Sequence, residues 1–161
     1  MKKILFLILA ISMLFSGCQS KMPSPEEVAI NSVYAFNMSV LNNSVSPVEV
    51  VSKLNSVSLT GCPQDFILAY KKYSDAWASF EPLAKKMYAD NLDKANADLR
   101  AFIQNYQQNP SVAALKLKQQ WKTLSPEVDT CCAELAKAFS LMKSLGVKYN
   151  AAYVPKAWFN M

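Results

Sequence analysis

The cysteines Cys18, Cys62, Cys131 and Cys132 carry the most reactive side chains in this chain of 161 residues. The chain has no histidine, so no thiol can be paired with an imidazole base. This excludes Ser-His-Asp and Cys-His nucleophile pairs, His-ligated zinc or haem, and histidine proton relays. The three glycines do not form a phosphate-binding loop motif. Most familiar catalytic sites are therefore excluded.

The acidic side chains do not form a catalytic pattern either. Asp90, Asp93 and Asp98 lie close in sequence, but the glycine and ligand spacing of a calcium loop is missing. Asp90 and Lys94 have the spacing of an exposed helical ion pair. Acid catalysis needs two carboxylates that converge in a pocket, and no spacing here brings a pair together. We therefore predict a protein that is not an enzyme, with no metal site and no cofactor.

The first 17 residues have the pattern of a secretory leader. Lys2 and Lys3 precede an apolar run from Ile4 to Phe15, which is too short to span a bilayer as a helix. The sequence Leu14-Phe15-Ser16-Gly17-Cys18 follows and resembles the lipobox of bacterial lipoproteins. This resemblance implies that Cys18 is lipidated and becomes the new N-terminus. An ordinary cleaved signal peptide or an uncleaved anchor is the alternative.

The same resemblance predicts the location of the protein. Gln19 follows the cysteine in place of the aspartate that often retains lipoproteins in the inner membrane. In a host with two membranes, we therefore expect the protein on the periplasmic face of the outer membrane. Loss of residues 1–17 removes two of 17 basic residues, leaving 15 against 12 acidic ones, a formal charge of +3. Arg100 is the single arginine. The chain therefore lacks the clustered arginines of nucleic-acid binders, and we expect the lipid bilayer as a partner instead.

Three thiols remain for the folded domain in an oxidising envelope. They predict one disulfide and one spare thiol, with Cys62 bridged to Cys131, or alternatively to Cys132. The weaker alternative is a soft-metal site built from Cys62 and the adjacent pair, which would make the protein a thiol-based metal carrier. A fourth ligand and a C-x-x-C motif are missing for that site.

Aromatic side chains recur at helical spacing in one segment. This stripe comprises Phe66, Tyr70, Tyr73, Trp77 and Phe80. Such spacing is typical of a bundle core, and the core is the favoured interpretation. Tyrosine hydroxyls need partners in a narrow core, so part of the stripe can instead open into a cleft. Tyr70, Tyr73 and Trp77 are then the candidate ligand contacts.

Proline and serine mark the starts of helices. Ser24-Pro25 and Ser46-Pro47 are each followed by a glutamate, and Asn109-Pro110 and Ser125-Pro126 repeat the cap and proline. Apolar residues between these marks follow the helical period, and no stretch alternates as a strand does. We predict helices over 25–43, 47–57, 63–89, 91–107, 110–124 and 126–145.

These helices predict an all-α fold, an antiparallel bundle of about five to six helices over residues 25–146. The unbroken aromatic stripe favours a kink at Pro82 over a split near Ser79. Gly146 is predicted to cap the last helix. Residues 18–24 form the lipidated cysteine and a short tether, and residues 147–161 form an aromatic tail that packs on the bundle or on a partner.

The sequence thus predicts a lipid-anchored envelope protein whose bundle is a binding or interaction module. It would hold an envelope protein or a small apolar ligand near the membrane, with Trp158 and Phe159 of the tail as further contacts. The alternative is a structural envelope lipoprotein without a discrete ligand.

Overall fold

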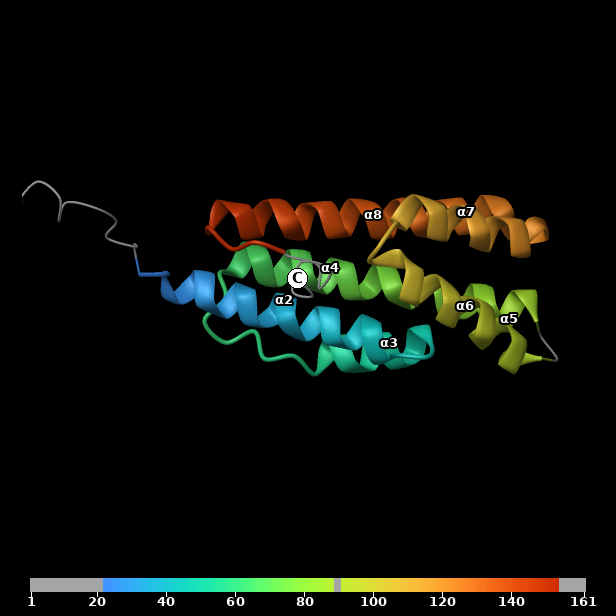
Figure 1. Ribbon diagram of the computed structural model, residues 1–161, viewed down its shortest axis with the longest axis horizontal. Helices are drawn as coiled ribbons and strands as arrows, with labels where there is room; N and C mark the ends of the chain where they lie inside the picture. Colours follow the sequence, from blue (N-terminus) through green and yellow to red (C-terminus); the bar gives the residue numbers. More distant parts are fainter. Residues whose placement is uncertain (1–21, 89–90, 154–161) are drawn as a thin grey trace, which may run out of the picture.

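The computed structural model describes residues 22–88 and 91–153 of the chain. These residues form an all-α fold without strands, as predicted, in which the helices pack against one another. Successive helices reverse direction along one long axis, except that α5 continues in the direction of α4, as Figure 1 shows. The helices are α2 (Pro25–Asn43), α3 (Pro47–Asn55), α4 (Gln64–Ala78), α5 (Phe80–Met87), α6 (Leu92–Tyr106), α7 (Pro110–Gln120) and α8 (Ser125–Lys148), with a 3-10 turn at Lys122–Leu124.

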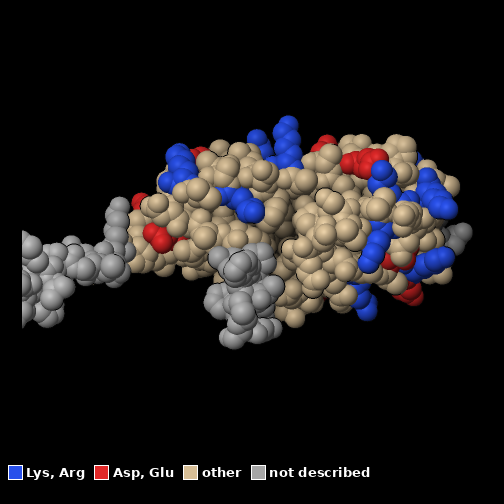
Figure 2. Space-filling model, turned by 45° about the horizontal axis from the view of Figure 1, so that its top comes forward, with Lys and Arg blue, Asp and Glu red and all other residues tan. Residues whose placement is uncertain are grey.

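The longest helix, α8, runs along much of the molecule and packs most extensively against α4 (Figure 1). At 1.5 Å per residue, its 24 residues span about 36 Å. The helix also contacts α5 and α7, so it joins both ends of the bundle. Charged side chains of both signs are interspersed over the face shown in Figure 2.

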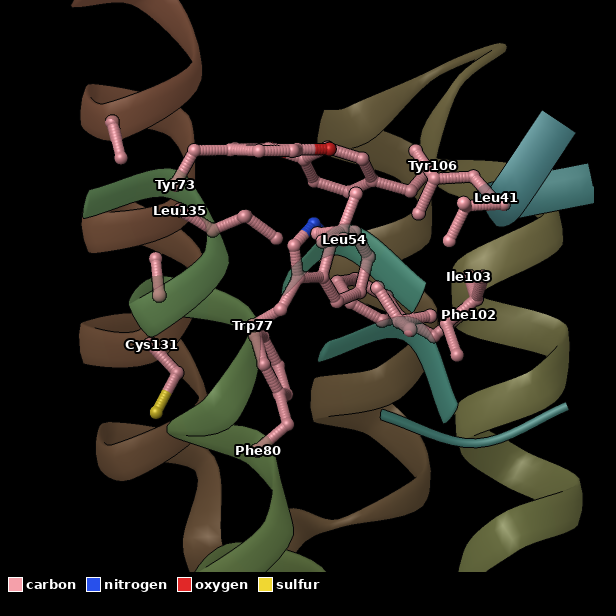
Figure 3. Close-up of a cluster of buried hydrophobic side chains, with 14 of the residues drawn as sticks. Leu41, Leu54, Tyr73, Trp77, Phe80, Phe102, Ile103, Tyr106, Cys131 and Leu135 are labelled. Atoms are coloured by element: carbon pink, nitrogen blue, oxygen red, sulfur yellow. The ribbon is translucent and has the colours of Figure 1, made fainter. Parts of the chain in front are cut away.

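Buried aromatic side chains fill the interior between α4, α6 and α8. The five members of the aromatic stripe are each 2% exposed or less, so the core interpretation of the stripe holds. Trp77 is packed between three other rings, with centroid distances of 5.9 Å to Phe80, 5.9 Å to Phe102 and 5.4 Å to Tyr106 (Figure 3). Burying several such side chains at about 1.5–3 kcal/mol each is the main force that holds the bundle together.

The predicted caps at three helix starts are present. The amides of Glu27, Glu49 and Val112 donate to the side chains of Ser24, Ser46 and Asn109, at 3.1, 3.3 and 3.1 Å.

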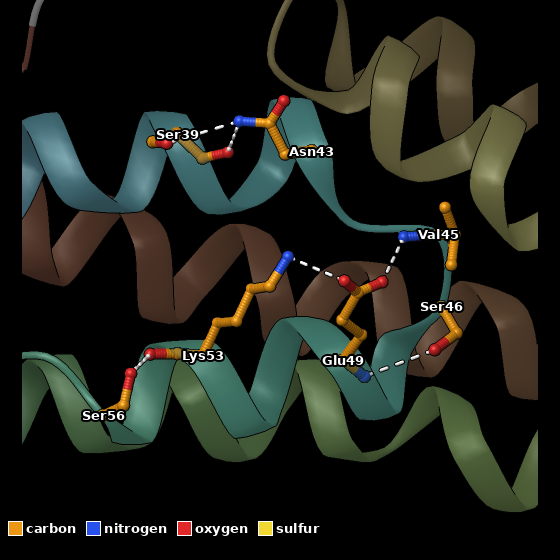
Figure 4. A network of polar contacts seen from close by, with 7 residues as sticks. All are labelled: Ser39, Asn43, Val45, Ser46, Glu49, Lys53 and Ser56. Atoms are coloured by element: carbon orange, nitrogen blue, oxygen red, sulfur yellow. Dashed lines mark hydrogen bonds and ion pairs between the residues drawn. The ribbon is translucent and has the colours of Figure 1, made fainter.

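The start of α3 is held by the contacts of Glu49 in addition to the serine cap. The Glu49 carboxylate accepts from the Val45 amide at 2.8 Å and pairs with Lys53 at 2.7 Å (Figure 4). The side chain of Lys53 and the backbone of Val45 together hold the pKa of Glu49 below its usual range. This network fixes the turn from α2 into α3.

The predicted single helix over 63–89 is wrong, because the structure divides it at Ser79 into α4 and α5. Pro82 has no N–H to donate to the carbonyl of Ala78, four residues earlier, and its ring crowds that carbonyl. The hydrogen-bond ladder therefore ends at Ala78, while Phe80 continues the buried line of the stripe.

Other helix boundaries also differ from the prediction. Ser125 lies inside α8 rather than at its cap, and Pro63 occupies the cap position of α4. The helix predicted to extend to residue 124 ends earlier, because α7 stops at Gln120 and Trp121 caps it. The indole of Trp121 is buried and donates to Asp98 at 2.8 Å.

The predicted cap at Gly146 is also wrong, because α8 continues through it to Lys148. The left-handed residue after the helix is Asn150, at φ 61°, and the Ala151 amide then donates to the carbonyl of Gly146 at 2.9 Å.

Candidate functional site

The predicted disulfide between Cys62 and Cys131 is absent, and these two cysteines and Cys132 are free thiols among the described residues. Cys62 precedes α4 at the end where Asp65 pairs with Lys148 of α8. Cys131 lies near the opposite end of α4, where its Sγ contacts the Ser79 carbonyl oxygen. The 15 residues of α4 between these points span about 22 Å. A disulfide requires Cα atoms within about 7 Å, so neither Cys131 nor Cys132 can reach Cys62.

The same separation excludes the alternative soft-metal site, because Cys62 lies too far from Cys131 and Cys132 to share a metal ion with them. Burial raises the pKa of Cys131 and raises that of Cys132 to about 12. Both thiols are therefore protonated at neutral pH, whereas metal binding and nucleophilic attack use the thiolate. Across residues 22–88 and 91–153, no three His, Cys, Asp or Glu side chains gather as metal ligands.

The three candidate contacts in the aromatic stripe differ in their surroundings. The Tyr70 hydroxyl donates to the Leu54 carbonyl at 3.3 Å, which satisfies it inside the core. Trp77 is enclosed by aromatic rings. Tyr73 lies on the wall of a cavity. Of the predicted contacts that the structure describes, Tyr73 alone borders a space that a ligand could occupy.

This tyrosine cavity has a volume of about 180 Å³ and lies where five segments meet. Its walls come from α2, α4, the junction where α6 ends and α7 begins, α8 and the segment after α8. The lining residues are Leu41, Tyr73, Tyr106, Gln107, Pro110, Phe139, Lys143 and Tyr153. An apolar cavity of about 150 Å³ in another protein is large enough to hold benzene. The tyrosine cavity therefore has room for one aromatic ring and a few polar atoms.

Polar atoms without partners surround this cavity. The hydroxyls of Tyr73 and Tyr106 are fully buried and have no hydrogen-bond partner among the described residues. Figure 3 shows the Tyr73 ring extending toward Tyr106. The Trp77 indole N–H and the Oδ1 atom of Asn37 are also buried without partners, but neither residue lines the cavity. Because each such atom costs about 1–3 kcal/mol, two on the lining of one cavity require an explanation.

The tyrosines of the cavity remain neutral at physiological pH. Burial raises the pKa of Tyr73 to about 12, and the nearby side chains of Trp77 and Asn37 oppose this rise only in part. Burial also raises the pKa values of Tyr106 and Tyr153 well above their usual range. These hydroxyls therefore act as hydrogen-bond donors and acceptors, not as phenolates.

A strap formed by residues 149–153 closes one side of the cavity. After the left-handed turn at Asn150, the Ala152 amide donates to Asn31 Oδ1 of α2 at 3.3 Å. The Tyr153 ring then packs on Tyr34 and Phe139, with centroid distances of 5.1 and 5.0 Å. Its hydroxyl accepts from Asn37 Nδ2 at 3.4 Å.

Sequence reasoning missed most of this site. Tyr106 and Phe139 lie at apolar positions of helical spacing, which indicate only the core, and Tyr153 belongs to the tail of residues 147–161, which has no helical period. The sequence does indicate that several tyrosines are buried in a core with few hydrogen-bond partners. It cannot show which of their hydroxyls lack a partner.

A second hollow, an open groove of about 360 Å³, lies on the surface between α4 and α8. Its floor is formed by Ala76, Ala138 and Leu141, and its edges carry charges of both signs. Its lining contains no unpartnered buried side-chain atom, unlike that of the tyrosine cavity.

The candidate residues Cys18, Trp158 and Phe159 lie outside the described residues. Within the part that is described, no helix has the length and apolar character to cross a bilayer. Comparisons of the chain with protein-family models, with curated proteins and with solved structures give no match.

Proposed function

We propose that this protein is a lipid-anchored envelope lipoprotein whose helical bundle binds a small, largely apolar ligand in the tyrosine cavity. The observation that carries the binding role is the pair of unpartnered buried hydroxyls, Tyr73 and Tyr106, on the cavity wall. A ligand that fills the space and bonds to these hydroxyls supplies the hydrogen-bond partners that the protein does not.

The proposed anchor is supported by the sequence Leu14-Phe15-Ser16-Gly17-Cys18, which resembles a lipobox. Several acyl chains on one cysteine would hold the protein firmly, because each buried CH₂ contributes about 0.8 kcal/mol. The first described residues, Met22 to Ser24, lead directly into α2, so the tether is short. The binding domain would then act close to the membrane surface.

The binding role is tested with Tyr73→Phe and phenol as the probe. In the ligand-free protein this change removes a hydroxyl without a partner, so the melting temperature should stay the same or rise. Phenol at millimolar concentration should raise the melting temperature of the parent protein, and this rise should be much smaller in Tyr73→Phe. Full-length protein in lipid nanodiscs avoids detergent entering the cavity.

Tyr70→Phe is the matched control, since it removes a hydroxyl of the same stripe that already donates to Leu54. It should lower stability by about 1 kcal/mol and leave the response to phenol unchanged. If phenol produces no shift in the parent protein, or equal shifts in all three proteins, the cavity holds only water and the binding role is wrong.

The anchor is tested by labelling cells with a fatty-acid probe. The parent protein should carry the label and fractionate with membranes, and Cys18→Ala should lose the label. Equal labelling of the two proteins would contradict the lipoprotein proposal, because it would place the acyl group elsewhere.

A further inference from the structure

The groups around the tyrosine cavity also indicate the class of ligand, an inference that depends on the proposed binding role. The inner wall carries unpartnered hydroxyl groups. The hydroxyls of Tyr73 and Tyr106 lack partners among the described residues, and each can donate a hydrogen bond to a ligand. A ligand oxygen that accepts hydrogen bonds from both hydroxyls satisfies this wall.

The mouth of the cavity adds a positive charge. Lys143 is exposed on α8, and its Nζ lies 5.5 Å from the centroid of the Phe139 ring. No carboxylate of the described residues lies within ion-pair distance of it. The lining contains no aspartate or glutamate, so Lys143 gives the entrance a net positive charge. A ligand with an anionic group at its outer end fits this arrangement.

The shape of the lining favours a flat ring between these two ends. Tyr73, Tyr106, Phe139 and Tyr153 contribute aromatic surface, which stacks well against a planar ring. The volume of about 180 Å³ limits the ligand to one ring with small substituents.

We infer that the tyrosine cavity binds a single-ring aromatic carboxylate that also carries an oxygen substituent on its ring. The oxygen substituent accepts from the hydroxyls of Tyr73 and Tyr106, and the carboxylate points toward Lys143. This ligand class matches the unpartnered hydroxyls of the inner wall, the aromatic sides and the positive entrance. The carboxylate stays at the solvent edge, where it keeps part of its hydration and avoids the large cost of burying a charge.

The inference is tested by calorimetric titration of the full-length protein in nanodiscs with two compounds of nearly equal shape. 4-Hydroxybenzoate carries a carboxylate, and 4-hydroxybenzyl alcohol replaces it with a neutral group. The parent protein should bind the carboxylate about fivefold more tightly, since an exposed ion pair contributes up to about that factor.

Lys143→Gln should remove this preference while leaving the affinity for the alcohol unchanged. Lys137→Gln, an exposed lysine of α8 that lines the outer groove instead, is the matched control and should keep the preference. Tyr106→Phe should weaken both compounds, because both carry the phenolic oxygen that contacts the inner wall.

The outcomes separate the two proposals. Equal affinity for the two compounds, or a preference that survives Lys143→Gln, would overturn the aromatic carboxylate as the ligand class and leave a neutral ligand in the cavity. Failure of both compounds and of phenol to bind would overturn the proposed function itself.

Discussion

At the scale of single residues, Gly146 shows how a distant contact can override a local signal. A glycine after Leu145 is typical of a helix end, and the sequence was interpreted in that way. In the structure Gly146 lies inside α8 against the ring of Tyr34, whose hydroxyl donates to the Met142 carbonyl at 3.0 Å. The sequence could not reveal this role, because Tyr34 is more than a hundred residues away.

Gly146→Ala should therefore destabilise the protein, although alanine normally favours a helix. The added Cβ would lie 2.8 Å from Tyr34 Cζ and closer still to the hydroxyl, so the buried ring must move. We expect a loss of about 1–3 kcal/mol in the free energy of unfolding, measured by urea denaturation. Ser144→Ala, on the exposed face of α8, should have little effect. An unchanged stability of Gly146→Ala would show that the Tyr34 contact is loose.

At the scale of helices, the sequence predicted the positions of most elements, because serine and asparagine caps and apolar spacing are local signals. The caps at Ser24, Ser46 and Asn109 are confirmed. The division at Ser79 was misjudged because the aromatic stripe continues across it, whereas the effect of Pro82 falls on the backbone. The strap over the tyrosine cavity has no period, so its path across α2 could not be predicted from the sequence.

The contact between the ends of α4 and α8 should make stability depend on acidity. Asp65 accepts from Lys148 at 2.8 Å and from the Tyr149 hydroxyl at 3.0 Å, and these bonds hold its pKa below the ordinary 3.8. Because the folded pKa is the lower one, this stabilisation is present above pH 3.8 and is lost as the pH falls through the folded value.

Asp65→Asn should therefore lower the stability at pH 7, and the difference from the parent should shrink in acid. Urea denaturation at pH 7 and below pH 3.8 measures this change. Asp75→Asn, on the same helix but without an ion pair among the described residues, is the control. A difference between Asp65→Asn and the parent that stays constant with pH would mean that the carboxylate charge does not act in this contact.

At the scale of the whole molecule, the all-α fold was predictable and the sites that depend on three-dimensional proximity were not. The disulfide prediction rested on the number of thiols, which carries no information about distance. Cys62 and Cys131 lie at opposite ends of α4. The tyrosine cavity likewise draws residues from five segments, and Tyr73 was the one member singled out in advance.

The long helix α8 should make the bundle unfold as one cooperative unit, since it packs on α4 at one end and on α5 and α7 at the other. The test is Asp98→Ala, which leaves the buried Trp121 N–H without the partner it has at 2.8 Å and also removes the bond from the Tyr88 hydroxyl. We expect Asp98→Ala to lower the free energy of unfolding by about 1–3 kcal/mol. Hydrogen exchange should show the same loss for slow amides of α2, far from the substitution, as for those of α6. Gln104→Ala, an exposed change in α6, should leave both sets unchanged. Reduced protection confined to α6 and α7 would instead mean that the two ends of the bundle unfold separately, despite the helix that they share.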